Sequence, residues 1–161
     1  MIMSRHLNTL HKIYARLKDS RVNWVVTGSL GMALQGMDIE VHDIDIQTDQ
    51  RGAYEIESKF PEYVAEPVRY SQSERICSHF GTLEIDGVKV EIMGDVQKRI
   101  TEQTWEEPIR VECYRRWVQI DGMQIPVLSL EYEYQAYLKL DRNEKAEMIR
   151  RWLQSSRTNS F

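Results

Sequence analysis

The chain has 161 residues, a formal net charge of −4 and a hydrophobic fraction of 42%. This length and composition predict one globular domain spanning residues 1–161, large enough to bury a sizeable core. The negative charge argues against a long nucleic-acid partner, because neutralising a phosphate backbone requires clustered Lys and Arg side chains. A small neutral or cationic ligand fits this charge at least as well.

The sequence carries no signal for secretion or membrane insertion. Residues 1–6 lack the apolar stretch of a signal peptide, and no apolar run is long enough to span a bilayer. The two cysteines, Cys77 and Cys113, lie far apart and show no metal-ligand spacing. These features predict a cytoplasmic protein with two reduced thiols.

Side-chain spacing at the start of the chain predicts a helix, a strand and a second helix. Apolar residues recur at helical spacing over residues 4–19, which indicates an amphipathic helix. Residues 23–27 are β-branched and apolar, as expected of a short buried strand. A short helix is expected over residues 30–35, with Ser29 at or near its N-cap.

The middle of the chain predicts a strand, a helix and two hairpins. Residues 41–47 alternate strictly between polar and apolar side chains, which indicates a strand, and residues 52–60 have helical spacing. Residues 80–93 and 117–128 each contain an Asp-Gly pair between apolar segments. An Asp-Gly pair in this setting is the strongest short signal for a β-hairpin.

The C-terminal part predicts a helix that begins at Ser129 and breaks near residues 141–143, with a frayed segment over residues 155–161. The domain then consists of a core over about residues 20–128 and a helical part over about residues 129–154. The order of elements predicts an α+β fold, with a mixed sheet flanked by helices.

Asp43 and Asp45 are the most informative residues of the chain. Side chains on a strand repeat with period two, so both carboxylates are expected on one face, while Ile44 and Ile46 point into the core. Two neighbouring negative charges need a cation, a proton or full solvation, and Mg²⁺ is commonly held by one or two carboxylates plus substrate phosphates. Taken alone, the pair also fits an ordinary solvated strand face.

Gly28 and Ser29 follow the first predicted strand at its turn into a helix. Glycine lets a backbone approach a phosphate closely, and the free N–H groups at a helix start bind anions. The Ser29 hydroxyl adds a further donor. A plain N-cap explains the same Gly-Ser pair without any ligand.

Glu91 is the third candidate residue. Val88, Val90 and Ile92 form one face of the predicted strand and are assigned to the core, which leaves Lys89 and Glu91 on the other face. If this strand lies beside the strand of Asp43 and Asp45, Glu91 completes a site of three carboxylates. It would act there as a metal ligand or as a general base, whereas a solvated Lys89–Glu91 face is the alternative.

Together, these segments resemble the signature of the nucleotidyltransferase superfamily, which has a DNA polymerase β-like fold. The matching segments are Thr27-Gly28-Ser29, His42-Asp43-Ile44-Asp45-Ile46 and Val90-Glu91-Ile92. Residues 24–34 are similar to the small antibiotic-modifying branch, the lincosamide and aminoglycoside nucleotidyltransferases. The resemblance covers residues 23–95 well and residues 134–152 more weakly.

The resemblance implies a role for each of these residues. Gly28 and Ser29 would hold a nucleoside triphosphate, and Asp43, Asp45 and Glu91 would form the catalytic, Mg²⁺-binding carboxylates. Glu91 stands where the family often has Asp, so its role as ligand or base stays open.

The implied activity is Mg²⁺-dependent transfer of a nucleoside monophosphate. AMP from ATP is the expected donor group, and a hydroxyl of a small compound, such as an aminoglycoside or a lincosamide, is the expected acceptor. A homodimer is also expected, because relatives often dimerise.

Three alternatives remain at this point. A toxin- or antitoxin-type nucleotidyltransferase would modify a protein or tRNA by the same chemistry. A fold relative would bind a nucleotide without catalysis, although it would then have kept its carboxylates. A general α/β binding domain would use residues 43–46 as a solvated strand face.

Overall fold

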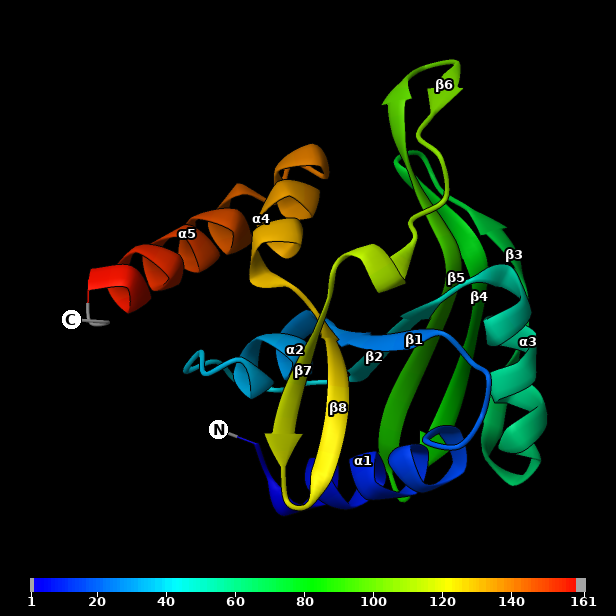
Figure 1. Cartoon of the computed structure of the whole chain (residues 1–161). Helices are drawn as coiled ribbons and strands as arrows, with labels where there is room; N and C mark the ends of the chain where they lie inside the picture. The colour runs from blue at the N-terminus through cyan, green and yellow to red at the C-terminus, as the bar shows by residue number, and fades with distance from the viewer. Residues whose placement is uncertain (1, 159–161) are drawn as a thin grey trace.

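The computed structural model describes residues 2–158 and contains one mixed β-sheet flanked by helices (Figure 1). Its strands are β1 (Trp24–Thr27), β2 (Ile44–Thr48), β3 (Val64–Gln72), β4 (Ile76–Ile85), β5 (Val88–Thr101), β6 (Thr104–Trp105), β7 (Arg115–Ile120) and β8 (Met123–Leu128). Its α-helices are α1 (Ser4–Leu17), α2 (Gly28–Leu34), α3 (Gln50–Lys59), α4 (Leu130–Lys139) and α5 (Asn143–Thr158). Two 3₁₀ turns are η1 (Pro61–Tyr63) and η2 (Val111–Cys113).

The strand order places the sequence-distant candidate strands next to one another. Along the sheet the order is β3-β4-β5-β2-β1-β8-β7, and the short β6 pairs with β5 outside this path. The β2–β5 and β1–β8 pairs are parallel, whereas the other pairs are antiparallel. The α+β fold with a mixed sheet, predicted from the sequence, is confirmed.

The main core lies between the sheet and the helices α1 and α3. Leu10, Ile13 and Leu17 recur along one side of α1 and are buried, as its amphipathic spacing predicted. This helix contacts β5 and β8, and α3 contacts β4 and β5, so the two helices cover the same side of the sheet. Ile44 and Ile46 of β2 are fully buried in this core, which leaves the alternate β2 side chains to face the other side.

Both predicted hairpins are confirmed. In the β4–β5 turn, Asp86 and Gly87 have φ angles of 51° and 82°, and in the β7–β8 turn Asp121 and Gly122 have φ angles of 50° and 77°. Two successive residues with positive φ are the requirement of the tight hairpin turn for which Asp-Gly is favoured.

The C-terminal helices follow the predicted plan. The Ser129 hydroxyl accepts a hydrogen bond from the backbone N–H of Tyr132 and caps α4. The helical conformation is interrupted between Lys139 and Asn143, where Asp141 has a φ of 58°. Helix α5 then packs against α4. Ile149 of α5 is buried in a second cluster with Met32, Met37 and Leu130, which joins these helices to α2.

Three local predictions were wrong. Helix α2 begins at Gly28, two residues before the predicted start, so Ser29 lies near the N-cap Thr27, and its hydroxyl accepts from the His42 N–H instead of capping the helix. Strand β2 begins at Ile44, one residue after Asp43, because the residues before it make no ladder with β1. Helix α5 continues to Thr158 instead of fraying from residue 155, and residues 159–161 lie outside the described part.

Strand β3 was not predicted, because it lies at the sheet edge and most of its side chains are exposed, without the alternation that reveals a half-buried strand.

Across residues 2–158, no helix has the length and apolar character needed to cross a membrane. Cys77 and Cys113 are both free, as predicted.

Candidate active site

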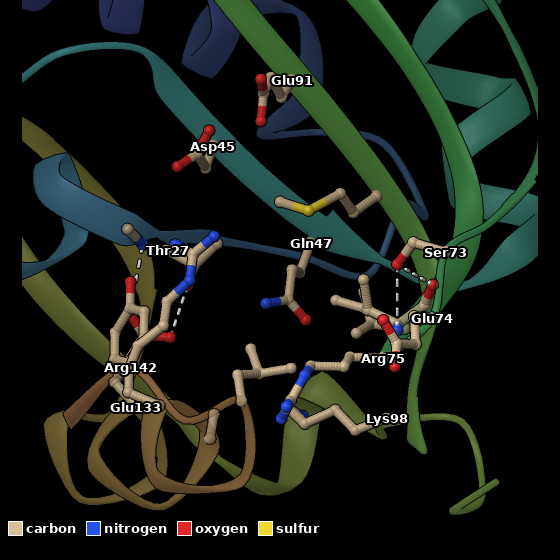
Figure 2. Close-up of a pocket in the computed structure, with 17 residues that line it drawn as sticks. Thr27, Asp45, Gln47, Ser73, Glu74, Arg75, Glu91, Lys98, Glu133 and Arg142 are labelled. Carbon is tan, nitrogen blue, oxygen red and sulfur yellow. Dashed lines mark hydrogen bonds between the residues drawn. The ribbon is translucent and has the colours of Figure 1, made fainter. Parts of the chain in front are cut away.

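A cavity of about 460 Å³ lies beside the β1–α2 junction, between the sheet and α4. Acidic side chains in its lining include Asp45, Glu91 and Glu133, and the basic ones are Arg75, Lys98 and Arg142. Figure 2 shows Asp45 and Glu91 together at one end, Gln47 near the middle, and Ser73, Glu74, Arg75 and Lys98 away from these two carboxylates. The cavity therefore offers carboxylates and cations to one ligand, within the size range of small-molecule sites.

The pairing of β2 with β5 brings Asp45 and Glu91 together. The two strands run in parallel, and Asp45 is the direct partner of Glu91 in their register. Because Ile44 and Ile46 point into the core, Asp45 must point to the opposite face, where Glu91 also lies. The two strands thus lie side by side, which is the condition on which a site of several carboxylates depends.

The crowding of carboxylates changes the acidity of Asp45. Burial, followed by the negative charge of Glu91 and a hydrogen bond with that carboxyl, raises the pKa of Asp45 from 3.8 to about 8. Asp43 and Glu133 add smaller contributions of the same sign. Among the described residues, no Lys or Arg forms an ion pair with Asp45. A bound cation would relieve this repulsion, since it favours the charged form of the acid.

Asp43 and Lys89 lie at the margin of this group. Asp43 is half-buried, lies just before β2 and is outside the cavity lining, but its charge still acts on Asp45 and on Lys89. Lys89 forms an ion pair with Glu91 at 3.2 Å, which raises the pKa of the lysine. The Lys89–Glu91 ion pair is what an ordinary solvated strand face would show. Glu91, however, also lines the cavity.

Gly28 lies directly against the Asp45 carboxylate. Its φ is +69°, and a Cβ atom at this position would lie 2.3 Å from Asp45 Oδ2. Its backbone N–H donates to Glu133 Oε2 at 3.2 Å, while the Ser29 hydroxyl accepts from the His42 N–H at 3.1 Å. The Gly28 N–H, predicted to meet a triphosphate, thus has a protein partner, and Ser29 is outside the cavity lining.

Gly28→Ala is expected to lower both stability and activity. The left-handed φ costs a non-glycine residue roughly 1–2 kcal/mol, and the added methyl group must also displace the Asp45 carboxylate. Urea denaturation and turnover with a nucleoside triphosphate measure the two effects.

Gly122→Ala is the matched control for this substitution. Gly122 has a φ of +77°, and nothing lies within 4 Å of its Cβ position, so this variant bears the conformational cost alone and keeps full activity. If both variants behave alike, the close approach of Asp45 to Gly28 has no consequence.

Glu133 was missed by the sequence analysis. It lies in the first turns of α4, is only 4% exposed and accepts hydrogen bonds from Thr27 Oγ1 at 2.7 Å and from the Gly28 N–H. Burial raises the pKa of Glu133 to about 7, although both hydrogen bonds act in the opposite direction. The available signal was its position on the buried side of α4 between Leu130 and Ala136, where an unpaired acid is unexpected.

The basic side chains of the cavity come from one strand and two loops, which are far apart in the sequence. Lys98 of β5 is buried and donates to Glu106 at 3.3 Å and to the Tyr132 hydroxyl at 3.0 Å. Arg75 pairs with Asp141 at 2.7 Å, and both side chains are largely exposed. These cations are spread over residues 75–142, so no single sequence segment could have predicted the group.

The arrangement fits a magnesium site that is completed by its substrate. In the described residues, no group of three or more His, Cys, Asp or Glu side chains could hold a metal ion by itself. Mg²⁺ does not require one, since it is usually bound by one or two carboxylates together with substrate phosphates. Asp45, which forms no ion pair with a Lys or Arg among the described residues, supplies the carboxylate oxygens that Mg²⁺ prefers as ligands.

Two comparisons identify the family. The sequence profile described as aminoglycoside-2''-adenylyltransferase matches residues 9–150. TM1012 of Thermotoga maritima, a nucleotidyltransferase candidate of known structure, is 63% identical, with 96% of each chain covered and a TM-score of 0.86. No curated protein sequence matches this chain.

More distant structures share the fold. ANT(2'')-Ia in complex with adenylyl-2''-tobramycin is 13% identical, with 96% of this chain and 92% of that chain covered and a TM-score of 0.61. Lincomycin-bound LnuA, a lincosamide antibiotic adenylyltransferase, is 17% identical, with 81% and 83% covered and a TM-score of 0.52. With the profile match and the identity to TM1012, these results show that the chain is a nucleotidyltransferase of the aminoglycoside-2''-adenylyltransferase family.

Proposed function

We propose that this nucleotidyltransferase moves AMP from ATP to a hydroxyl group of a small acceptor, in a Mg²⁺-dependent reaction. The observation that carries the proposal is the pairing of Asp45 with Glu91 at one end of a cavity that also contains Arg75, Lys98 and Arg142. A bound nucleoside triphosphate with its Mg²⁺ requires carboxylates that bind the metal ion and cationic side chains that bind the phosphate groups.

In the proposed site, Asp43 and Asp45 hold Mg²⁺, and Glu91 is a third ligand or the base that accepts the acceptor's proton. Mg²⁺, when bound, would neutralise charge on the phosphate oxygens. Gly28 and Ser29 would lie along the triphosphate, as the family resemblance implies. The N–H of Gly28 already donates to Glu133, so its contribution would be the absence of a Cβ atom beside the Asp45 carboxylate.

The proposed acceptor class follows the family description and two structures of the same fold, which were solved with adenylyl-2''-tobramycin and with lincomycin. Protein and tRNA acceptors remain the alternative within the same chemistry. The single-domain organisation, the cytoplasmic location and the homodimer expected from the sequence stay predictions.

Calorimetric titration of ATP, GTP, CTP and UTP, each with and without Mg²⁺, tests the proposal. We expect Mg²⁺-dependent binding of ATP to the wild type and its loss in the Asp43→Asn plus Asp45→Asn variant, by about tenfold or more. Tobramycin, lincomycin and tRNA, each added with the bound nucleotide, then test the acceptor by release of pyrophosphate. Binding that is equal in both proteins would exclude the two aspartates from the nucleotide site.

A further inference from the structure

Glu133 connects the C-terminal helices to the β1–α2 junction. Strand β8 runs parallel to β1 and leads directly into α4, so the first turns of α4 lie beside the end of β1. The Glu133 carboxylate, almost fully buried, accepts from the Thr27 hydroxyl through one oxygen and from the Gly28 N–H through the other. Figure 2 shows Glu133 beside Thr27, on the side of the cavity formed by α4.

The two residues that donate hydrogen bonds to Glu133, Thr27 and Gly28, are also direct neighbours of Asp45. Thr27 is the direct partner of Asp45 in the β1–β2 register. Gly28 lies so close to the Asp45 carboxylate that a Cβ atom there would be 2.3 Å from Oδ2. A shift of the Gly28 backbone must therefore move the Asp45 carboxylate or open a gap beside it.

We infer that Glu133 is a positioning residue that holds the Thr27–Gly28 turn against Asp45 and so sets the direction of the Asp45 carboxylate in the cavity. This inference rests on the proposed function, in which Asp45 binds Mg²⁺. Glu133 acts through Gly28 and Thr27 and has no direct role in the transfer.

The chemistry of the contact explains why this residue is an acid. Thr27 O–H and Gly28 N–H both donate, and an ionised carboxylate supplies an acceptor for each of them. Glutamine has one acceptor oxygen, and its NH₂ group can only donate. The Thr27 hydroxyl would therefore have to rotate and accept a hydrogen bond from that NH₂ group. A substitution of similar size thus disturbs the turn without opening a cavity.

The test compares Glu133→Gln with Glu131→Gln. Glu131 lies in the same first turn of α4 and is exposed, so this control removes an equal charge from the helix start without touching the cavity. Binding of Mn²⁺ alone, followed by electron paramagnetic resonance, reports the Asp45 site directly. The backbone amide shift of Gly28 reports the turn, and pyrophosphate release from ATP with tobramycin gives kcat and KM.

For Glu133→Gln, we expect Mn²⁺ affinity and kcat to fall by about 10–100-fold, the usual cost of losing a partner that orients a metal ligand. The KM for tobramycin should stay within about threefold, and the Gly28 amide should shift upfield as it loses a charged acceptor. Glu131→Gln should match the wild type in every measurement. Thr27→Val should give a smaller loss, and Thr27→Ser, which restores a hydroxyl, should recover most of it.

Glu133→Gln with unchanged Mn²⁺ affinity and kcat, and only a lower Tm, would overturn the inference and leave Glu133 as a structural anchor. If Glu133→Gln does not fold, the Thr27→Val and Thr27→Ser pair decides by the same readouts. A wild type that lacks turnover with every triphosphate would contradict the proposed function instead. In that case, Mn²⁺ binding and the Gly28 amide shift still decide whether Glu133 positions Asp45.

Discussion

The Asp45→Asn substitution should reduce nucleotidyl transfer by about a thousandfold or more and, at the same time, raise the Tm of the metal-free protein. The loss follows from the proposed role of Asp45, because the stabilisation that a metal site gives to a phosphoryl transition state is worth several kcal/mol. Asn keeps the shape of the side chain but supplies a neutral oxygen in place of a charged one.

The gain in stability has a separate cause. In the folded protein the pKa of Asp45 is about 8, against an ordinary value of 3.8, so at neutral pH folding has to take up a proton or tolerate a buried charge. Either requirement lowers the free energy of unfolding, by an amount on the order of a few kcal/mol. Removing the acid removes that cost, and for a chain of this length the gain corresponds to roughly 5–15 °C in Tm.

Thermal unfolding without metal and pyrophosphate release with Mg²⁺ measure the two effects of Asp45→Asn. Asp121→Asn is the control, since Asp121 has the same chemistry, lies in the exposed β7–β8 turn with a φ of 50° and is remote from the cavity. Asn also tolerates positive φ, so this variant should keep its activity. Wild-type turnover in Asp45→Asn would exclude Asp45 from the reaction, and a lower Tm would mean that its carboxylate stabilises the fold.

Elements with strong local signals could be predicted from the sequence. The amphipathic face of α1, the Asp-Gly turns and the alternation in β2 each follow from contacts within one segment. Boundaries were less certain, because they depend on distant partners. Strand β2 begins at Ile44, where its pairing with β5 begins, and the Ser29 hydroxyl accepts a hydrogen bond from the His42 N–H, 13 residues away.

The candidate site was predicted only in part. Asp45 and Glu91 each lie on a strand that the sequence reveals, but that these strands are neighbours is seen only in their register. Glu133 reaches Thr27 from a position 106 residues later in the chain, and this contact depends on the parallel pairing of β8 with β1. No local pattern contains that information.

The buried carboxylates of this site lower the free energy of unfolding of the protein. Asp45 and Glu133 both have raised pKa values, and burial is the first cause for each. Active sites commonly show such a conflict, since groups arranged to bind a ligand are left unsatisfied without it. A cation that binds near Asp45 should thus stabilise the protein, and the size of that effect should depend on pH.

Without metal, the free energy of unfolding should fall as the pH rises from about 5 to about 8. An acid with a raised folded-state pKa keeps its proton in the native state at a pH where the unfolded chain has lost it. The folded protein then binds more protons than the unfolded chain, and stability decreases with pH. Asp45 contributes from 3.8 to about 8 and Glu133 from 4.5 to about 7, so Asp45 acts across the whole window from about 5 to about 8 and Glu133 across its lower part.

Mg²⁺ should reverse this trend, because it favours the charged form of Asp45. We expect a saturating concentration to raise the Tm by several degrees more at pH 8 than at pH 6, where a proton competes with the metal for the carboxylate. Urea denaturation from pH 5 to pH 8, with Mg²⁺ and with EDTA, gives both curves. In Asp45→Asn, both the decline with pH and the Mg²⁺ effect should shrink, whereas Glu133→Gln should keep the part of the decline that belongs to Asp45. Stability that rises steadily from pH 5 to pH 8 without metal would mean that these carboxyls are not protonated in the folded protein, and the argument for a cation site at Asp45 would lose its electrostatic basis.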